Sequence, residues 1–296
     1  MKELKFIEYI KKRAGKPGKG IIAGIGDDAA VIEYRDNQYL LWATDMIIEG
    51  THFTLKNASL ENIGHKAVAV NISDIAAMGG EPKYITVNIG VPRGFTAKQL
   101  SRIYDGIFSI CGNYGMSIVG GDTNASDKLV IDVSILGVAR KNALIRRNGA
   151  KEGDLILITG PIRDGKKEHL TFVPRVKESR FLSRNFKITS MIDVSDGISV
   201  DLNRLCAESK TGAIIYQSAV LLSENLSLED ALYYGESFEL LFTMSPSEVK
   251  KLFLSSEKHK FAYCVIGEIT DKKEGCILVK KEGLMVRLQK RGYRHM

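Results

Sequence analysis

Aspartates in small-residue surroundings are the side chains of this chain best suited to chemistry. They occur in five separate motifs, most of them at the end of an apolar run or inside an apolar helix. The motif residues are Asp27 and Asp28 in GIGDDAAV, Asp45 in ATDM, Asp74 in NISDIAAM, Asp122 in GGDT, and Asp193 and Asp196 in IDVSDG. Burying an unpaired carboxylate is expensive, and these motifs hold too few lysines and arginines to neutralise all of them. The pattern therefore predicts bound Mg²⁺ or Ca²⁺, since both cations prefer oxygen ligands.

Most of these aspartates also have a structural explanation when each is taken alone. Asp27 or Asp28 could be a turn residue beside glycine, as could Asp122, and Asp196 could cap the helix that follows it. Asp74 differs, because it lies in the middle of an expected helix among Ile and Ala residues. Five such motifs together favour a shared cation site over five unrelated structural roles.

Two glycine-rich segments imitate nucleotide-binding loops. Residues 15–20 (GKPGKG) have the spacing of a P-loop but lack the Lys-Ser/Thr that should follow. Residues 24–29 (GIGDDA) fit a dinucleotide fingerprint, but a strand-like run follows where a helix is needed. Nucleophilic catalysis also has little support, since the chain has no GxSxG. His52 in EGTHF, seven residues after Asp45, could be a structural residue or a substrate contact.

The composition is that of an ordinary globular protein. The 296 residues are 44% hydrophobic and 26% charged, which suits one large or two ordinary domains and excludes collagen, coiled coil and whole-chain disorder. The net charge of +7 comes with no nucleic-acid motif, so neither nucleic acid nor membrane is expected as a partner. Four scattered cysteines and the absence of a secretory signal predict a cytoplasmic location.

The hydrophobic pattern predicts an α/β or α+β protein in two domains. The polar, turn-rich stretch 140–153 marks the boundary, so we expect one domain over 1–141 and another over 142–296. Expected helices are 1–12, 59–78, one from Thr96 with Gln99 as a capping box, 198–209 with Gly212 as its stop, and one after Ser245-Pro246. Expected strands are 28–34, 39–45, 83–90, 117–119, 129–139, 154–159, 189–193, 237–243 and 261–269, with an irregular stretch at 161–187 and a hairpin around Glu274-Gly275.

Taken in order, the motifs resemble the thiamine-monophosphate kinase family, within the aminoimidazole-ribotide-synthetase-like ATP-binding superfamily. The resemblance covers nearly the whole chain and rests on GIGDDAAVI, TDMIIEGTHF, IGHKAVAVNISDIAAMGGEP, GGDT, RRNGAKEGD, IDVSDG and GESFELLFT. It implies an N-terminal mixed sheet with helices that forms a barrel-like interface in a homodimer, and a C-terminal α/β domain. It also implies that 1–141 binds ATP and Mg²⁺, and that 142–296 binds substrate and nucleotide.

The activity implied by the resemblance is Mg²⁺-dependent transfer of the ATP γ-phosphoryl to thiamine monophosphate, giving thiamine diphosphate. Carried over by position, the metal ligands are Asp28, Thr44, Asp45, Asp74, Asp122, Asp193 and Asp196. The nucleotide contacts are Tyr104, Gly121, Asp122, Arg147 and Ser195, and the substrate contacts are His52, Glu236 and Tyr293. Catalysis itself is expected to depend on Asp45, Asp74, Asp122 and Arg147. A phosphate acceptor is already deprotonated at neutral pH, so the absence of a convincing general base agrees with this chemistry.

The chain departs from the family in two places. Tyr234 and Ser237 stand where the family usually has glycine and aspartate, and 161–168 replace a small-residue helix. Both changes lie in the substrate-facing half and leave three alternatives open. One is a superfamily kinase with another acceptor, for which Glu236 or His52 could be the base. The others are an ATP-dependent enzyme that activates an amide or carbonyl oxygen, as in purine-pathway relatives, and a non-catalytic nucleotide-binding protein.

Overall fold

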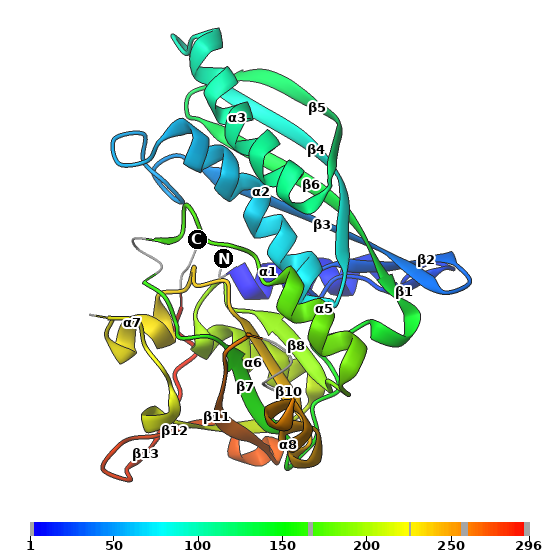
Figure 1. Ribbon diagram of the computed structural model, residues 1–296, viewed down its shortest axis with the longest axis vertical. Coiled ribbons are helices and arrows are strands. Elements are labelled where there is room, and N and C mark those ends of the chain that lie inside the picture. Colours follow the sequence, from blue (N-terminus) through cyan, green and yellow to red (C-terminus); the bar gives the residue numbers. More distant parts are fainter. Residues whose placement is uncertain (1–2, 165–167, 225, 256–259, 293–296) are drawn as a thin grey trace.

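Two β-sheets and their helices make up the computed structural model, which describes residues 3–164, 168–224, 226–255 and 260–292 (Figure 1). The helices are α1 (Glu3–Ala14), α2 (Leu60–Ala77), α3 (Ala97–Tyr114), α5 (Val176–Asn185), α6 (Ile198–Ser209), α7 (Leu228–Tyr233) and α8 (Pro246–Leu254), with 3-10 turns at Lys141–Ala143, Gln217–Ala219 and Lys272–Glu274. The strands are β1 (Ile21–Ala23), β2 (Ala30–Arg35), β3 (Gln38–Ile48), β4 (Glu81–Pro92), β5 (Ser117–Ser126), β6 (Val130–Arg140), β7 (Leu155–Thr159), β8 (Ser190–Asp193), β9 (Gly212–Tyr216), β10 (Leu240–Met244), β11 (Tyr263–Thr270), β12 (Cys276–Val279) and β13 (Met285–Arg287). The predicted α/β (α+β) class is confirmed.

The N-terminal sheet has six strands in the order β1-β2-β3-β6-β4-β5, of which only the β4–β5 pair is parallel. Helices α2 and α3 cover one of its faces (Figure 1). Alternate residues of β3, such as Leu41 and Ala43, are buried beneath these helices, as the period of a strand requires. On the opposite face Trp42 and Tyr84 are about half exposed, at 53% and 50%.

Helix α2 is the central element of the molecule. Ser59 caps its start by accepting a hydrogen bond from the amide of Asn62, and Gly79 follows its end with a φ of 72°. The helix packs against α3 and the N-terminal sheet on one side, and against α5 and β8 on the other. It therefore touches both halves of the chain, and a side chain on α2 can meet residues from either half.

The C-terminal sheet has seven strands in the order β13-β12-β9-β11-β7-β10-β8, and only β9–β12 is parallel. Both faces are covered, because β7 sends Ile156 and Ile158 into one buried cluster and Leu157 into another. The first cluster includes residues of α6 and α7, and the second includes residues of α5 and α8. None of the described helices is long and apolar enough to cross a membrane.

Two strand predictions were wrong at their ends. The strand expected at 117–119 continues through the Gly-Gly-Asp to Ser126, because β4 pairs with it along its whole length. Gly121 allows this pairing, since a Cβ there would overlap the carbonyl of Val87. The strand expected at 237–243 begins only at Leu240, because Glu236 and Phe238 adopt left-handed backbone conformations that no strand contains.

Three other local predictions were also wrong. The stretch 161–187, expected to be irregular, contains helix α5. Its charged side chains lie on the outer side, and Val176, Ser179 and Leu182 are buried on the other side. Helix α6 ends at Ser209 with Lys210 in the left-handed conformation, and Gly212 begins β9. No hairpin joins β11 to β12, because β9 lies between them in the sheet.

Candidate active site

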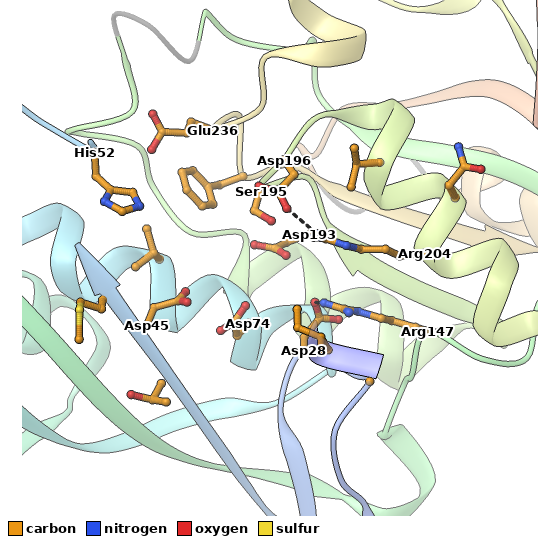
Figure 2. Close-up of a pocket in the computed structure, with 18 of the residues that line it drawn as sticks. Asp28, Asp45, His52, Asp74, Arg147, Asp193, Ser195, Asp196, Arg204 and Glu236 are labelled. Carbon is orange, nitrogen blue, oxygen red and sulfur yellow. Dashed lines mark hydrogen bonds and ion pairs between the residues drawn. The ribbon is translucent and has the colours of Figure 1, made fainter. Parts of the chain in front are cut away.

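A cavity of about 730 Å³ lies between the two halves of the chain. Its walls come from α1, the loop before β2, β3, α2, the loop after β8 and α6 (Figure 2). Ten residues predicted for the site line this cavity: Asp28, Thr44, Asp45, His52, Asp74, Arg147, Asp193, Ser195, Asp196 and Glu236. Segments that are distant in sequence, including those of Arg147 and Glu236, thus contribute to one cavity surface.

Three carboxylates converge at the centre of the cavity. Asp28 comes from the turn before β2, Asp74 from α2 and Asp193 from the end of β8, and one oxygen of each lies within 4.8 Å of the others (Figure 2). Burial raises the pKa of each carboxyl, and the neighbouring carboxylates raise it further. The second oxygen of Asp28 is buried and has no hydrogen-bond partner among the described residues. Three carboxylates, one of which has an oxygen without a hydrogen-bond partner among the described residues, are suitable ligands for a divalent cation that prefers oxygen.

Neighbouring groups hold these carboxylates in place. Arg147 donates from Nη2 to Oδ1 of Asp28 at 2.5 Å, and Ser73 donates its hydroxyl to Asp193 at 2.7 Å. Burial alone would lower the pKa of Arg147, but the charges of Asp28 and Asp193 raise it, so the guanidinium stays cationic. Asp27 has a different role, because it accepts hydrogen bonds from the Arg147 amide at 3.0 Å and from Nε of Arg146 at 2.9 Å.

Asp45 extends the acidic cluster along β3. Its amide donates to the side chain of Asn71 on α2 at 3.1 Å, which fixes the strand against the helix. Burial, followed by the charges of Asp196 and Asp28, raises the pKa of Asp45 to about 7. The hydroxyl of Thr44 donates to Asp132 at 3.2 Å, so that this side chain is already engaged.

Asp196 and Arg204 form an ion pair beside this cluster. Arg204 lies 2.6 Å from Asp196 and donates to Asp201 at 2.9 Å, and Asp201 accepts from the Asp196 amide at 2.9 Å (Figure 2). Sequence reasoning missed Arg204, although its place in α6, eleven residues after Asp193, brings it back over the same loop.

The far end of the cavity, here called the Lys66 end, is formed by His52, Lys66, Glu236 and Phe238. Lys66 was also missed, although a lysine inside the apolar run IGHKAVAV is unusual. Its side chain is only 1% exposed, and its ammonium group forms an ion pair with Glu236. This end therefore combines one buried cation with the carboxylate that we expected to meet the substrate.

Three predicted residues lie outside the cavity. Tyr104 is on α3 and packs against the N-terminal core. Gly121 and Asp122 lie on β5, the edge strand, which β4 and β6 separate from β3. The chain's own fold therefore does not bring these residues to the acidic cluster. Tyr293 lies outside the described residues.

Comparisons with known proteins agree with this geometry. Residues 26–139 match the family model for the N-terminal domain of AIR synthase related proteins, and 141–280 match the model for the C-terminal domain. The thiamine-monophosphate kinase of Buchnera aphidicola subsp. Schizaphis graminum is 36% identical, covering 99% of this chain and 98% of its own. The Bacillus subtilis enzyme is 33% identical, covering 92% and 93%.

The chain belongs to the thiamine-monophosphate kinase family. The solved structure of AaThiL complexed with AMPPCP and TMP shares the fold with a TM-score of 0.84 and 26% identity, covering 100% of this chain and 97% of its own. The resemblance inferred from the motifs is thereby confirmed.

The departures from the family motif can now be located. Neither Tyr234 nor Ser237 lines the cavity, whereas Glu236 between them does. The hydroxyl of Ser237 is directed at the Val194 carbonyl, 3.4 Å away, behind the cavity wall. The loop is held by left-handed residues, with a φ of 84° at Gly235 and 57° at Glu236, and by the Glu236 amide, which donates to the Ser195 carbonyl at 2.8 Å.

Proposed function

We propose that this protein transfers the γ-phosphoryl group of ATP to thiamine monophosphate, giving thiamine diphosphate. The observation that carries the proposal is the convergence of Asp28, Asp74 and Asp193 in one cavity beside the partly buried Arg147. Relatives up to 36% identical over nearly the whole chain are thiamine-monophosphate kinases, which supports the choice of acceptor. Transfer between two phosphate-bearing reactants requires positioning and charge neutralisation more than covalent chemistry, and the cavity supplies both.

The acidic cluster would hold Mg²⁺, which when bound neutralises the negative charge that the two phosphate-bearing reactants bring together. We assign Asp28, Asp45, Asp74, Asp193 and Asp196 as its ligands, with Thr44 at the margin. Arg147 and Ser195 are proposed to contact the nucleotide. Arg147 is well suited to phosphate, since its guanidinium is fixed by Asp28 and points into the cavity (Figure 2).

His52 and Glu236 at the Lys66 end are proposed to contact the acceptor. The thiazolium ring of thiamine monophosphate is cationic and its aminopyrimidine carries hydrogen-bond donors, so a carboxylate is a suitable partner. The amide of Ile48 donates to Nδ1 of His52 at 3.0 Å, which fixes the orientation of the ring. Because Tyr234 and Ser237 are absent from the cavity lining, the substitutions there need not change the acceptor.

Purified protein incubated with ATP, Mg²⁺ and thiamine monophosphate tests the reaction. We expect thiamine diphosphate, measured by fluorescence after oxidation, with a rate that falls when Mg²⁺ is chelated. If another metabolite is phosphorylated and thiamine monophosphate is not, the proposed acceptor is wrong. ATP binding without any turnover would overturn the enzymatic proposal.

We also propose that the protein is a cytoplasmic homodimer. The outer face of the N-terminal sheet, with Trp42 and Tyr84 half exposed, suits a second copy, and so does the edge strand β5. In a dimer Tyr104, Gly121 and Asp122 would complete the nucleotide site of the partner. Residues 1–141 would then provide dimerisation and cation binding, and 142–296 would complete the nucleotide and acceptor sites. A mass near 32.7 kDa by light scattering would contradict the dimer.

A further inference from the structure

Lys66 is a fully buried cation at the end of the cavity where the acceptor is proposed to bind. Its Nζ donates to the His52 carbonyl at 2.9 Å, to Nδ1 of His169 at 2.6 Å and to Oε1 of Glu236. An ammonium group has three donors, so every one of them is used. Burial lowers the pKa of Lys66, while its hydrogen bond and ion pair with Glu236 counteract the shift.

His169 takes part as a neutral acceptor. Burial and the charge of Lys66 lower its pKa to about 4, so the imidazole is uncharged at neutral pH. Its Nδ1 accepts from Lys66 and therefore brings no positive charge to Glu236, whose Oε2 lies 3.2 Å away. Among the described residues, Lys66 thus holds the Glu236 carboxylate through a buried ion pair.

The groups around Lys66 come from different parts of the chain. Lys66 and His65 lie on α2, while His169 and Glu236 belong to loops of the C-terminal half. His65 reinforces the same junction, since its Nε2 lies 2.9 Å from the carbonyl of Phe172. The ring of Phe172 in turn stacks on Phe238, with centroids 4.0 Å apart and an angle of 11° between the rings. Both C-terminal loops are therefore tied to α2 beside the acceptor end.

The backbone of the Glu236 loop is strained at two positions. Glu236 and Phe238 have φ values of 57° and 50°, which non-glycine residues rarely adopt. A carboxylate on a strained loop needs a fixed partner if its direction is to be defined. Lys66 provides that partner from a long helix, which also carries Asp74 eight residues further on.

We propose that Lys66 is a positioning residue for the acceptor, acting through the carboxylate of Glu236. The inference rests on the proposed function, because it assigns the Lys66 end to the acceptor and the acidic cluster to the nucleotide and its cations. Loss of the ammonium group removes the ion pair that ties Glu236 to α2, so acceptor binding should weaken while nucleotide binding stays intact.

A double-mutant cycle tests this dependence. Lys66→Met keeps the length of the side chain without its charge, and Glu236→Gln removes the charge it faces. We expect Lys66→Met to raise the KM for thiamine monophosphate by about 30-fold, with the Kd for Mg²⁺–AMPPCP changed less than about threefold. In the Glu236→Gln background the same substitution should raise the KM by less than about threefold, because its target is already lost.

Lys83→Met is the matched control, since Lys83 pairs with Glu81 in a half-exposed ion pair away from the cavity. It should leave both affinities unchanged. Lys66→Arg is a second variant for the case in which Lys66→Met does not fold. This variant keeps the positive charge but displaces it. We therefore expect a smaller rise in the KM for thiamine monophosphate, with the Kd for Mg²⁺–AMPPCP unchanged.

Failure of the proposal for Lys66 and failure of the proposed function give different experimental results. An active wild type whose Lys66→Met variant keeps its KM for thiamine monophosphate overturns the inference alone. Equal losses of acceptor and AMPPCP binding, or additive effects of the two substitutions, overturn it as well, because they indicate a general structural role. A wild type that neither binds nor phosphorylates thiamine monophosphate overturns the proposed function and this inference together.

Discussion

At the scale of single residues, Asp27 and Asp28 are adjacent and chemically identical, yet their side chains make different contacts. Asp27 accepts hydrogen bonds from the 146–147 segment, whereas Asp28 faces the cavity with one oxygen unpaired among the described groups. The turn before β2 directs Asp27 toward the 146–147 segment and Asp28 toward the acidic cluster, so only one of the two contributes to the proposed cation site.

Asp74→Asn should reduce turnover by about 100-fold or more, because it removes one carboxylate from the proposed cation site. In the absence of Mg²⁺ the variant should have a higher Tm than the wild type, since like charges no longer meet at the cluster. Calorimetry with and without Mg²⁺ measures both effects. Asp105→Asn, on the exposed side of α3, is the control. Near-normal activity of Asp74→Asn would refute the cation site.

Stabilisation by Mg²⁺ should increase as the pH rises. Asp45 has a pKa of about 7, and the pKa values of Asp74 and Asp193 are raised well above the usual range. A carboxyl whose folded pKa is raised stabilises the cation-free protein at low pH, and this stabilisation is lost as the pH rises from about 4 through that pKa. Mg²⁺ competes with those protons, so the Tm increase on adding it should be larger at pH 8 than at pH 5.5. Equal Tm increases at the two pH values would contradict the assignment.

At the scale of elements, the contact between α2 and α3 determines where the site residues of α2 lie. The two helices approach closely at Gly64 and Gly106, where an added Cβ would overlap the carbonyls of Ile103 and Glu61. Because α2 carries both Lys66 and Asp74, a shift of this helix would move both the Lys66 end of the cavity and the acidic cluster at its centre. Gly64 and Gly106 therefore allow the close packing of α2 and α3, and this packing fixes the position of the cavity residues on α2.

Gly106→Ala and Gly112→Ala should have opposite effects, although both glycines lie in α3. Alanine favours a helix by about 1 kcal/mol over glycine. At Gly106 the overlap with Glu61 should outweigh this gain, giving a net loss of about 1–3 kcal/mol in the free energy of unfolding. No atom lies within 4 Å of a Cβ added at Gly112, so that variant should be more stable by about 0.5–1 kcal/mol. Urea unfolding measures both, and a stabilising Gly106→Ala would contradict the close packing.

At the scale of the whole molecule, the cavity lacks three residues that the family motif supplies. Tyr104, Gly121 and Asp122 belong to the N-terminal half, but two strands, β6 and β4, separate the β5 residues from β3. A second copy placed against the outer face of the same sheet could bring its own β5 to this cavity. The proposed dimer would therefore complete the proposed site and also cover the exposed sheet face.

Mixing two inactive variants tests whether Asp122 acts across the dimer. Asp74→Asn and Asp122→Asn should each be inactive alone. Co-refolded in equal amounts, they should recover about a quarter of the wild-type activity, because half of the dimers are mixed and each mixed dimer holds one intact site. No recovery, with mixed dimers shown by mass spectrometry, would place both aspartates in one protomer's site.

The local sequence was enough to predict the class of fold, most elements and the aspartates themselves. Periodic apolar residues, the Thr96–Gln99 capping box and the glycine after α2 act over a few residues, so they can be read directly. Two of the errors occurred where long-range pairing overrides local preference, in β5 and in the β9 strand that separates β11 from β12.

The tertiary structure decided which of the predicted residues meet. It gathered Asp28, Asp74 and Asp193 from three distant segments, left Asp122 on an edge strand, and buried Lys66 against Glu236. Sequence spacing contains no information on these contacts, because each depends on how two sheets and α2 pack together. The aspartates and their chemistry come from the sequence, whereas the division of the cavity into a cation cluster and an acceptor end comes from packing.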